Sequence, residues 1–503
     1  MAYAITQTCC NDASCVSVCP VNCIHPTPDE PEFGTTDMLF IDPQTCIDCG
    51  ACADACPVDA VFPVDRLSGS DSVFTELNRQ HFEAHPADNA WAAPRFPRSL
   101  PEPVAAPRVA VVGTGPAAGY TVQSLLRSTD AEITLLDRSP VPGGLIRYGV
   151  APDHPSTKRI GDSFAVGYRH PRVRMHLGVE VGRDISHAEL AAHHHAVVYA
   201  VGAAGSRSLG VPGEELPGSI PATTFVGWCN GRPDIPAGAI DLSAERAVVV
   251  GNGNVALDVA RMLLTDPDEL AKTGIADHAL AALRGSKVRE VVLLGRRGPE
   301  QAAYTRPEFL ALRRLRGARI VVDEHGGVAG DIAAAAPGSV AGLLHGLPVE
   351  PVDWTFPPAE GKRLVLRFGS APTEALGDQH VRAVRVGDDV HGTRDIRTGL
   401  LVRSIGSRGV PVPGLPFDPD TGVIPNSGGR VERGTYVVGW AKRGATGGIG
   451  ANRTCAEETV DALLGDAAAG RLPAPARGAK EFARLLRGRT ANRAGTPPRS
   501  VSA

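Results

Sequence analysis

Two stretches of the chain repeat one pattern of hydrophobic and polar positions: a short run of apolar residues, a glycine turn and a helical segment with an apolar face. The first covers residues 108–127 and is followed by the apolar run AEITLLD at 131–137. The second covers residues 246–264 and is followed by VREVVLLGRR at 288–297. Continuous apolar runs of this length are typical of strands buried on both faces. The pattern therefore predicts two α/β units, each built on a parallel sheet.

The glycine turn of the first unit is suited to a dinucleotide. Gly113, Gly115 and Ala118 form GxGxxA directly after the strand. The first glycine permits the tight turn, the second lets a pyrophosphate approach the backbone, and the alanine allows close helix packing. Asp137 ends the next strand, where a carboxylate accepts from a ribose hydroxyl. We predict that this unit binds an adenine dinucleotide.

The second unit repeats the turn but ends its next strand differently. Gly251, Gly253 and Ala256 form the turn, and Arg296 and Arg297 stand where the first unit has an acid. An arginine pair at this place suits the 2'-phosphate of NADP and offers nothing to the free hydroxyl of NAD. The second unit is therefore predicted to bind NADP.

The first 65 residues, called the head here, differ from the rest in composition. Nine of the eleven cysteines lie within the first 56 positions, and the head holds ten Asp or Glu and no Lys or Arg. The whole-chain net charge of -4 thus divides into -10 for the head and +6 for the remainder. An acidic head excludes nucleic acid and acidic membrane surfaces as its partners, and clustered cysteines in a reducing compartment point to metal or redox chemistry. No apolar run is long enough to span a membrane and the start lacks a signal-peptide pattern, so we expect a cytoplasmic protein.

The cysteine spacing predicts iron–sulfur ligation. Cys46, Cys49, Cys52 and Cys56 followed by proline spell C-x2-C-x2-C-x3-C-P, in which the fourth cysteine serves the other cluster. The upstream copy has Asp12 where its middle cysteine belongs. The fourth cysteine of each copy, Cys19 or Cys56, is therefore assigned to the cluster of the other copy. This gives two sets of ligands, which we name by their size. The four-cysteine set is Cys19, Cys46, Cys49 and Cys52, and the three-cysteine set is Cys9, Cys15 and Cys56.

The four-cysteine set suits a [4Fe-4S] cluster. The three-cysteine set suits a [3Fe-4S] cluster, or a second [4Fe-4S] cluster if Asp12 ligates its last iron, and we favour the three-iron form. Two cysteines remain outside the sets. Cys23 is interpreted as a packing thiol. Cys10 is an alternative to Cys9 that we do not favour.

The opening AYAIT, the CPVNCI turn and the IDPQTCIDCGACADACPVDAV stretch resemble a two-cluster bacterial ferredoxin of the seven-iron type. The following body resembles the adrenodoxin-reductase type of ferredoxin:NADP reductase. That second resemblance is carried by PVPGGLIRYGVAPDHPSTK, VEVGRDI, YAVGA, GNGNVALDVAR, GRRGP and GWAKRGATGGIGANR.

The reductase resemblance implies FAD in the first unit and NADPH in the second. It implies FAD contacts at Ala117, Asp137, Leu145, Val181, Trp440, Gly447, Gly448 and Ile449. It implies NADP contacts at Asn252, Gly253, Asn254, Val255, Arg296, Arg297, Glu308 and Gly447. Two matched polar residues are candidates for a catalytic role near the flavin, His154 and Asp258, although a structural role explains each equally well.

We predict an α/β protein with two Rossmann-like dinucleotide-binding domains, for FAD and NADP, preceded by a small α+β two-cluster ferredoxin domain. The expected bounds are 1–65 for the ferredoxin domain, 66–106 for a linker, 107–203 with 396–475 for the FAD domain, 204–395 for the NADP domain and 476–503 for a mobile tail. That tail contains one short helix near residues 480–486. We also expect the acidic head to dock on the basic body near the flavin.

The combination favours a ferredoxin:NADP oxidoreductase that passes electrons between NADPH, FAD, its own clusters and an external one-electron acceptor, such as a ferredoxin or a cytochrome P450 system. Two alternatives stay open: an electron-input subunit resembling the small subunit of glutamate synthase, and a non-enzymatic redox carrier or sensor.

Overall fold

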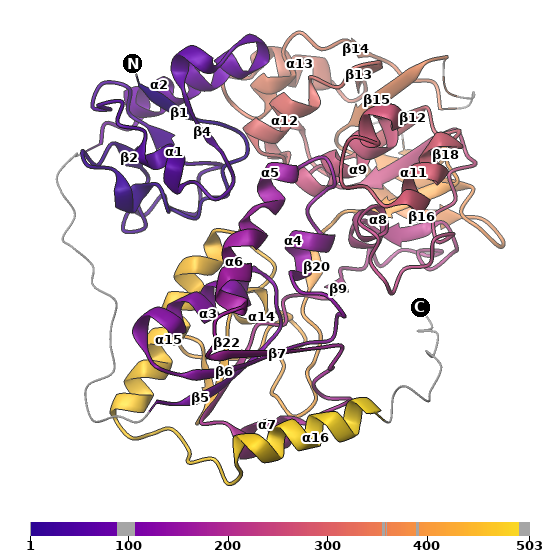
Figure 1. Ribbon diagram of the computed structural model, residues 1–503. Helices are drawn as coiled ribbons and strands as arrows, with labels where there is room; N and C mark the ends of the chain where they lie inside the picture. The colour runs from indigo at the N-terminus through magenta and orange to yellow at the C-terminus, as the bar shows by residue number, and fades with distance from the viewer. Residues whose placement is uncertain (1, 88–105, 355–357, 359, 389–391, 492–503) are drawn as a thin grey trace.

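A computed structural model describes residues 2–87, 106–354, 358, 360–388 and 392–491 (Figure 1). They form the head and two parallel-sheet units, which confirms the predicted fold class. No helix among these residues is long and apolar enough to cross a membrane.

The head, which extends to residue 84 in the structure, is a small α+β domain whose two-stranded sheets are antiparallel. Its strands are β1 (Tyr3–Ile5), β2 (Ile24–His25), β3 (Phe40–Ile41) and β4 (Val61–Pro63). Its helices are α1 (Ala51–Ala55), α2 (Val73–Ala84) and the short 3-10 turns η1 (Val16–Val18), η2 (Val64–Arg66) and η3 (Gly69–Ser72).

Helix α2 corrects the predicted start of the linker. Phe74 and Leu77 are buried in the core of the head, and the buried Asn78 side chain joins two strands. Its Oδ1 accepts from the backbone amides of Ile5 at 3.1 Å and Ile41 at 2.8 Å. An apolar face and satisfied backbone amides make α2 part of the domain. The linker expected over 66–106 was therefore wrong up to residue 84, while residues 88–105 lie outside the described part.

The first sheet unit has a six-stranded sheet in the order β21-β22-β8-β5-β6-β7. These strands are β5 (Arg108–Val112), β6 (Glu132–Asp137), β7 (Val173–Leu177), β8 (Ala196–Tyr199), β21 (Arg430–Glu432) and β22 (Thr435–Val437). Its helices are α3 (Pro116–Ser128), α4 (Gly144–Tyr148), α5 (Pro155–Lys158), α6 (Ile160–Tyr168), α7 (His187–His193), α14 (Trp440–Arg443), α15 (Ala451–Ala468) and α16 (Ala479–Ala491). Figure 1 shows α15 beside α3, on the side of the unit nearest the head.

Helix α16 corrects the prediction of a mobile tail from residue 476. The helix is longer than the expected turn at 480–486, and Phe482 and Leu486 are buried against this unit. The Phe482 ring lies edge-on to the ring of His194, with centroids 4.8 Å apart. Burial of two large apolar side chains holds this segment in place. Residues 492–503 lie outside the described part.

The second sheet unit has a seven-stranded sheet in the order β10-β19-β11-β12-β15-β13-β14 and a three-stranded antiparallel sheet. The large sheet contains β10 (Ser219–Pro221), β11 (Arg246–Val250), β12 (Glu290–Leu294), β13 (Ala318–Asp323), β14 (Val349–Glu350), β15 (Lys362–Arg367) and β19 (Leu400–Arg403). The small sheet contains β16 (Ala371–Leu376), β17 (Ala383–Asp388) and β18 (Gly392–Arg397). The helices are α8 (Ala222–Cys229), α9 (Asn254–Leu264), α10 (Pro267–Leu270), α11 (Asp277–Arg284), α12 (Arg306–Leu312) and α13 (Val328–Ala334), with 3-10 turns η4 (Pro299–Gln301) and η5 (Ala341–Leu344).

Strand β19 corrects the predicted boundary at residue 395. It lies between β10 and β11 in the second sheet, so the chain returns to the first unit only after residue 403. The two chain crossings between the units run side by side as β9 (Gly205–Ser206) and β20 (Ser407–Arg408). An apolar strand pairs with whichever sheet buries it, and that choice depends on contacts distant in sequence.

Candidate cofactor and cluster sites

The head folds its two cysteine loops with the same backbone turns. Asn11 and Asp48, each two residues after a cysteine, have φ of 56° and 59°. Ala13 and Gly50, two residues further on, have φ of 57° and 77°. A left-handed alanine is uncommon, so its presence indicates that the loop shape is imposed by the fold. Asp12 therefore occupies the loop position that corresponds to Cys49.

The structure gathers the cysteines into the two predicted sets. Cys19, Cys46, Cys49 and Cys52 line one small cavity in the head. In the three-cysteine set, burial raises the pKa of the Cys15 thiol, and the neighbouring charges of Cys9 and Cys56 raise it further. Such thiols bind metal as thiolates only when the positive charge of the iron offsets that burial.

The spacing of the thiols fits clusters better than single ions. Among the described residues, no three cysteine sulfur atoms lie within 4.8 Å of one another. A tetrahedral zinc site with bonds of about 2.3 Å would place its sulfur atoms about 3.8 Å apart. The described thiols are thus too far apart to hold a single tetrahedral ion by three sulfur atoms.

Asp12 is turned toward its own loop. The side chain is buried, one carboxylate oxygen accepts from the hydroxyl of Ser14, and the other accepts from the Ser14 amide at 3.4 Å.

Cys23, interpreted from sequence as a packing thiol, lies closer to a ligand than that interpretation implied. Its sulfur is 3.4 Å from that of Cys19, and it lines the same cavity as the four-cysteine set.

The turn at Gly113–Ala118 is shaped as an adenine dinucleotide requires. Gly113 has a φ of 114°, and a Cβ there would lie 2.4 Å from the carbonyl oxygen of Ala200. Gly115 caps α3, whose first amides face the turn. One oxygen of Asp137 accepts from the backbone amide of Thr114 at 2.8 Å and from its hydroxyl at 2.5 Å. Ala118 is fully buried where α3 packs.

Two further predicted FAD residues, Leu145 and Val181, lie on other segments, and the segment of Leu145 approaches this turn at Gly144. Leu145 is unusually exposed for an apolar side chain, at 39%, and Val181 is half-buried at a β-bridge. An exposed leucine beside a glycine turn is what a bound flavin nucleotide would cover. These features fit FAD.

The loop at residues 440–449 reaches the same place from the far end of the chain. The indole Nε1 of Trp440 donates to the carbonyls of Thr446 at 3.0 Å and Gly447 at 3.2 Å. The Asn452 side chain donates to the carbonyls of Gly448 at 3.1 Å and Ile449 at 2.9 Å. Sequence reasoning missed Asn452, although its place in the quoted GANR stretch was a signal.

The second unit carries the predicted NADP residues around the turn before α9. Gly251 has a φ of 112°, and Gly253 caps α9. The Asn252 side chain accepts from the Ala303 amide at 3.2 Å and that of Asn254 from the Thr305 amide at 2.8 Å. These bonds tie the turn to the segment at residues 303–305.

Three side chains remain available to a ligand at this turn. Val255 is 42% exposed, and Arg296 and Arg297 are exposed directly after β12. Two exposed guanidinium groups beside a phosphate-binding turn fit a nucleotide with an extra phosphate.

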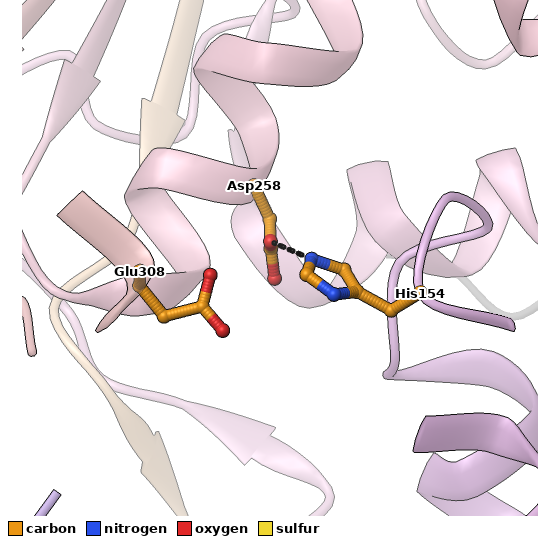
Figure 2. A group of neighbouring side chains, drawn as sticks. All are labelled: His154, Asp258 and Glu308. Carbon is orange, nitrogen blue, oxygen red and sulfur yellow. Dashed lines mark ion pairs between the residues drawn. The ribbon is translucent and has the colours of Figure 1, made fainter. Parts of the chain in front are cut away.

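His154, Asp258 and Glu308 face one another where the two sheet units meet (Figure 2). His154 precedes α5, Asp258 lies on α9, and Glu308 lies on α12. The Nε2 of His154 is 3.3 Å from Oδ1 of Asp258. Among the described residues, the buried Oε2 of Glu308 has no hydrogen-bond partner, so it is free to receive a donor from a bound nucleotide.

Arg261 completes this group and was missed by sequence reasoning. It pairs with Asp153 through bonds of 2.5 and 3.1 Å and lies 2.6 Å from Asp258. Arg261 stands three residues after Asp258 on one helix, and such pairs share a helix face, which was the available signal. Its guanidinium already supplies positive charge, which disfavours a metal cation here.

The charges of this group shift its acids and its histidine. Burial alone would lower the pKa of His154, but the hydrogen bond and charge of Asp258 outweigh it and raise that pKa above its ordinary value. Burial would raise the pKa of Asp258, yet His154 and Arg261 hold it below its ordinary value. For Glu308, burial raises the pKa. The arrangement thus favours a charged link between the sheet units.

Ion pairs as well as backbone hydrogen bonds join the head to the body. Asp59 pairs with Arg159 of the first unit, and Asp71 pairs with Arg314 of the second at 2.6 Å. Figure 1 places the head beside α12 and above the near end of α15. Two ion pairs therefore join acidic residues of the head to arginines of the body, while the expected position near the flavin stays a prediction.

Comparisons with known proteins point to one family. A family profile described as "4Fe-4S dicluster domain" matches residues 8–60. A Mycobacterium tuberculosis protein named "Probable ferredoxin/ferredoxin–NADP reductase" is 48% identical over 497 residues, covering 94% of this chain and 85% of the relative. A Mycobacterium leprae protein of the same name is 45% identical, covering 97% of this chain and 90% of the relative.

A solved structure agrees with these relatives. Mycobacterium tuberculosis FprA in complex with NADPH matches with a TM-score of 0.69 and 43% identity, over 77% of this chain and 91% of that one. The match to the longer relatives extends through the head, the glycine turns and the loop at 440–449. The chain belongs to the ferredoxin/ferredoxin–NADP reductase family.

Proposed function

We propose that this chain is an FAD-dependent ferredoxin–NADP reductase that passes electrons from NADPH through FAD to the clusters of its own head and then to an external one-electron acceptor. When bound, FAD supplies the conversion between hydride transfer and single-electron transfer. The reaction balances as one NADPH and two oxidised acceptors giving NADP⁺, one proton and two reduced acceptors.

The observation that carries this proposal is the combination of sites on one fold. Two glycine turns, an arginine pair after β12 and two cysteine sets lie on three packed domains. A hydride donor and a one-electron cluster cannot exchange electrons directly, so a flavin site joined to both is what such a chain needs. The alternatives, a subunit of a larger complex or a carrier without activity, have no supporting contact of their own.

Within this proposal each residue has a limited task. Arg296 and Arg297 bind the 2'-phosphate, and Glu308 accepts a hydrogen bond from the nucleotide. His154 and Asp258 hold the faces of the two sheet units together, which orients nicotinamide against flavin. We assign residues 2–84 to the ferredoxin domain, the segment between β9 and β20 to the NADP domain, and the two flanking segments to the FAD domain.

The Asp12 geometry favours a three-iron cluster in the three-cysteine set. A carboxylate that already accepts two hydrogen bonds from Ser14 must release them to bind iron. We propose [4Fe-4S] for the four-cysteine set and [3Fe-4S] for the three-cysteine set. The external acceptor is a ferredoxin or a cytochrome P450 system, and a cytoplasmic location stays a prediction.

The test is anaerobic rapid mixing of the purified holoprotein with NADPH, followed by addition of ferredoxin or cytochrome c. We expect loss of flavin absorbance, then cluster reduction, then reduction of the added acceptor. A protein with full FAD and iron content that transfers no electrons from NADPH would contradict the proposal.

A further inference from the structure

We propose that electrons enter the head at the three-cysteine set, through the contact between Gly450 and Cys10, and reach the four-cysteine set only afterwards. This order rests on the proposed function and adds to it a direction within the head. It follows from which cysteine loop contacts the FAD domain and which one faces solvent.

The contact is a backbone hydrogen bond of 2.9 Å from the amide of Gly450 to the carbonyl of Cys10. Gly450 directly follows Ile449, the last residue of the candidate FAD loop. Cys10 directly follows Cys9, a member of the three-cysteine set. One hydrogen bond and a few covalent bonds therefore join the flavin loop to a cluster ligand.

The approach at this point requires glycine. A Cβ at residue 450 would lie 2.2 Å from the backbone of Asn11 and 2.3 Å from the carbonyl oxygen of Cys10. Gly450 itself has ordinary helical backbone angles, with a φ of -64° and a ψ of -34°. Only the packing of the head, and not the local backbone, excludes a side chain here.

Arg453, in the first turn of α15, makes a second contact with the same loop. Its Nη1 donates to the carbonyl of Asp12 at 2.9 Å and to the hydroxyl of Ser14 at 3.2 Å. The loop of the three-cysteine set is thus bonded to α15 along its length. Since Arg453 donates to the backbone of Asp12, it also steadies the residue that replaces the missing cysteine.

The four-cysteine set has the opposite surroundings. Cys49 is exposed, and Ile47 beside it is 58% exposed. An acceptor in solution can approach this loop, whereas the loop at Cys9–Cys15 is covered by α15. Each cluster takes one electron, so the two electrons of one NADPH reduce both centres in turn, leaving NADP⁺ and one proton.

The test compares Gly450→Ala with Arg314→Gln as the matched control. Gly450→Ala adds one methyl group at the proposed passage, while Arg314→Gln removes an ion pair between head and second unit elsewhere. In freeze-quench electron paramagnetic resonance with NADPH, the wild type should show the three-cysteine cluster reduced before the four-cysteine cluster.

In Gly450→Ala, we expect flavin-to-cluster transfer to slow by up to about tenfold, because overpacking that costs about 1.4 kcal/mol lowers the equilibrium constant for docking by one decade. Arg314→Gln should change the rate less than about threefold. A second readout needs no turnover: amide hydrogen exchange at residues 9–15 should accelerate in Gly450→Ala and not in Arg314→Gln. If Gly450→Ala fails to retain FAD, Arg453→Gln replaces it: loss of its hydrogen bonds to Asp12 and Ser14 should likewise slow transfer and accelerate exchange at residues 9–15.

Two outcomes would overturn this order. Reduction of the four-cysteine cluster first, or together with the other, would place the entrance elsewhere. An unchanged transfer rate with accelerated exchange in Gly450→Ala would show that the contact does not carry electrons. Both leave the proposed function standing, whereas absence of any flavin reduction by NADPH in the wild type would remove that function itself.

Discussion

The loops at Asp12 and Cys49 have matching backbone turns but opposite surroundings. Asp12 lies buried beneath α15 with its carbonyl bonded to Arg453, and Cys49 is exposed beside Ile47. The loop that lacks a cysteine is the one that contacts the FAD domain. The difference teaches that the head is not symmetric in use: one cysteine loop is an internal contact, and the other is available to a partner.

Loss of one ligand of the four-cysteine set should have the largest effect on reduction of an external acceptor. We expect Cys49→Ser to abolish reduction of added ferredoxin or cytochrome c by NADPH, because the four-cysteine cluster is the proposed point of exit. The three-cysteine cluster should still be reduced, as electron paramagnetic resonance would show. Full acceptor reduction by a variant that has lost this cluster would contradict the proposed exit point, since electrons would then leave from the three-cysteine set.

Loss of the arginine pair should weaken NADPH binding, a step that precedes electron transfer to either cysteine set. With Arg296 and Arg297 both replaced by alanine, we expect the KM for NADPH to rise at least about a hundredfold, since each charged hydrogen bond contributes about 1.5–3 kcal/mol. The KM for NADH should change little. Steady-state kinetics with both nucleotides checks this, and equal effects on the two would refute the 2'-phosphate assignment.

Asp12→Cys should give the loop at Asp12 the same ligand pattern as the loop at Cys49. Since the loop turns already match, we expect a gain of about one iron per chain and replacement of the three-iron signal by a four-iron signal. Iron counting with electron paramagnetic resonance measures both. Asp12→Ala is the control and should leave the three-iron signal intact. A four-iron cluster in the wild type that becomes three-iron in Asp12→Ala would show that Asp12 is a ligand.

A smaller effect is expected from the pH response of His154. Its pKa is raised in the folded protein, so the charged link with Asp258 stabilises the fold fully below the ordinary histidine pKa and is lost as the pH rises through the raised value. In Asp258→Asn, burial and the Arg261 charge remain and should lower the His154 pKa. The pH dependence of flavin reduction should move accordingly. Reduction of the two clusters should show the same pH dependence, because His154 and Asp258 act before electrons reach either cluster.

The smallest effect is expected from the exposed ion pairs of the head. Pairs such as Arg159 with Asp59 contribute about 0–1 kcal/mol and are screened by salt. Replacing Asp59 by asparagine, or raising the salt concentration, should therefore slow flavin-to-cluster transfer less than about threefold. A steep salt dependence in rapid-mixing measurements would show that charge, and not the Gly450 contact, sets the docked state.

Sequence spacing alone was enough to propose the parts of the site whose chemistry depends on it, and these assignments stay predictions. The cysteine sets, the two glycine turns and the arginine pair follow from local patterns that permit few other uses. Helix α2 was missed because its place in the domain depends on contacts distant in sequence: Phe74 and Leu77 pack in the core of the head, and Asn78 bonds two strands. Strand β19 was placed in the wrong unit because an apolar strand carries no mark of its partner. The contact of Gly450 with Cys10 joins residues 440 positions apart, and no local pattern reports it.

The matching turns extend to the ends of the two loops, where Asn22 and Asp59, each three residues after a fourth cysteine, have φ of 50° and 49°. Such a repeat is what an internal duplication of one ancestral half would leave behind. A backbone maintained by its own turns allows one copy to lose a ligand without unfolding. The duplicated halves could then diverge into unlike redox centres while the scaffold stayed the same.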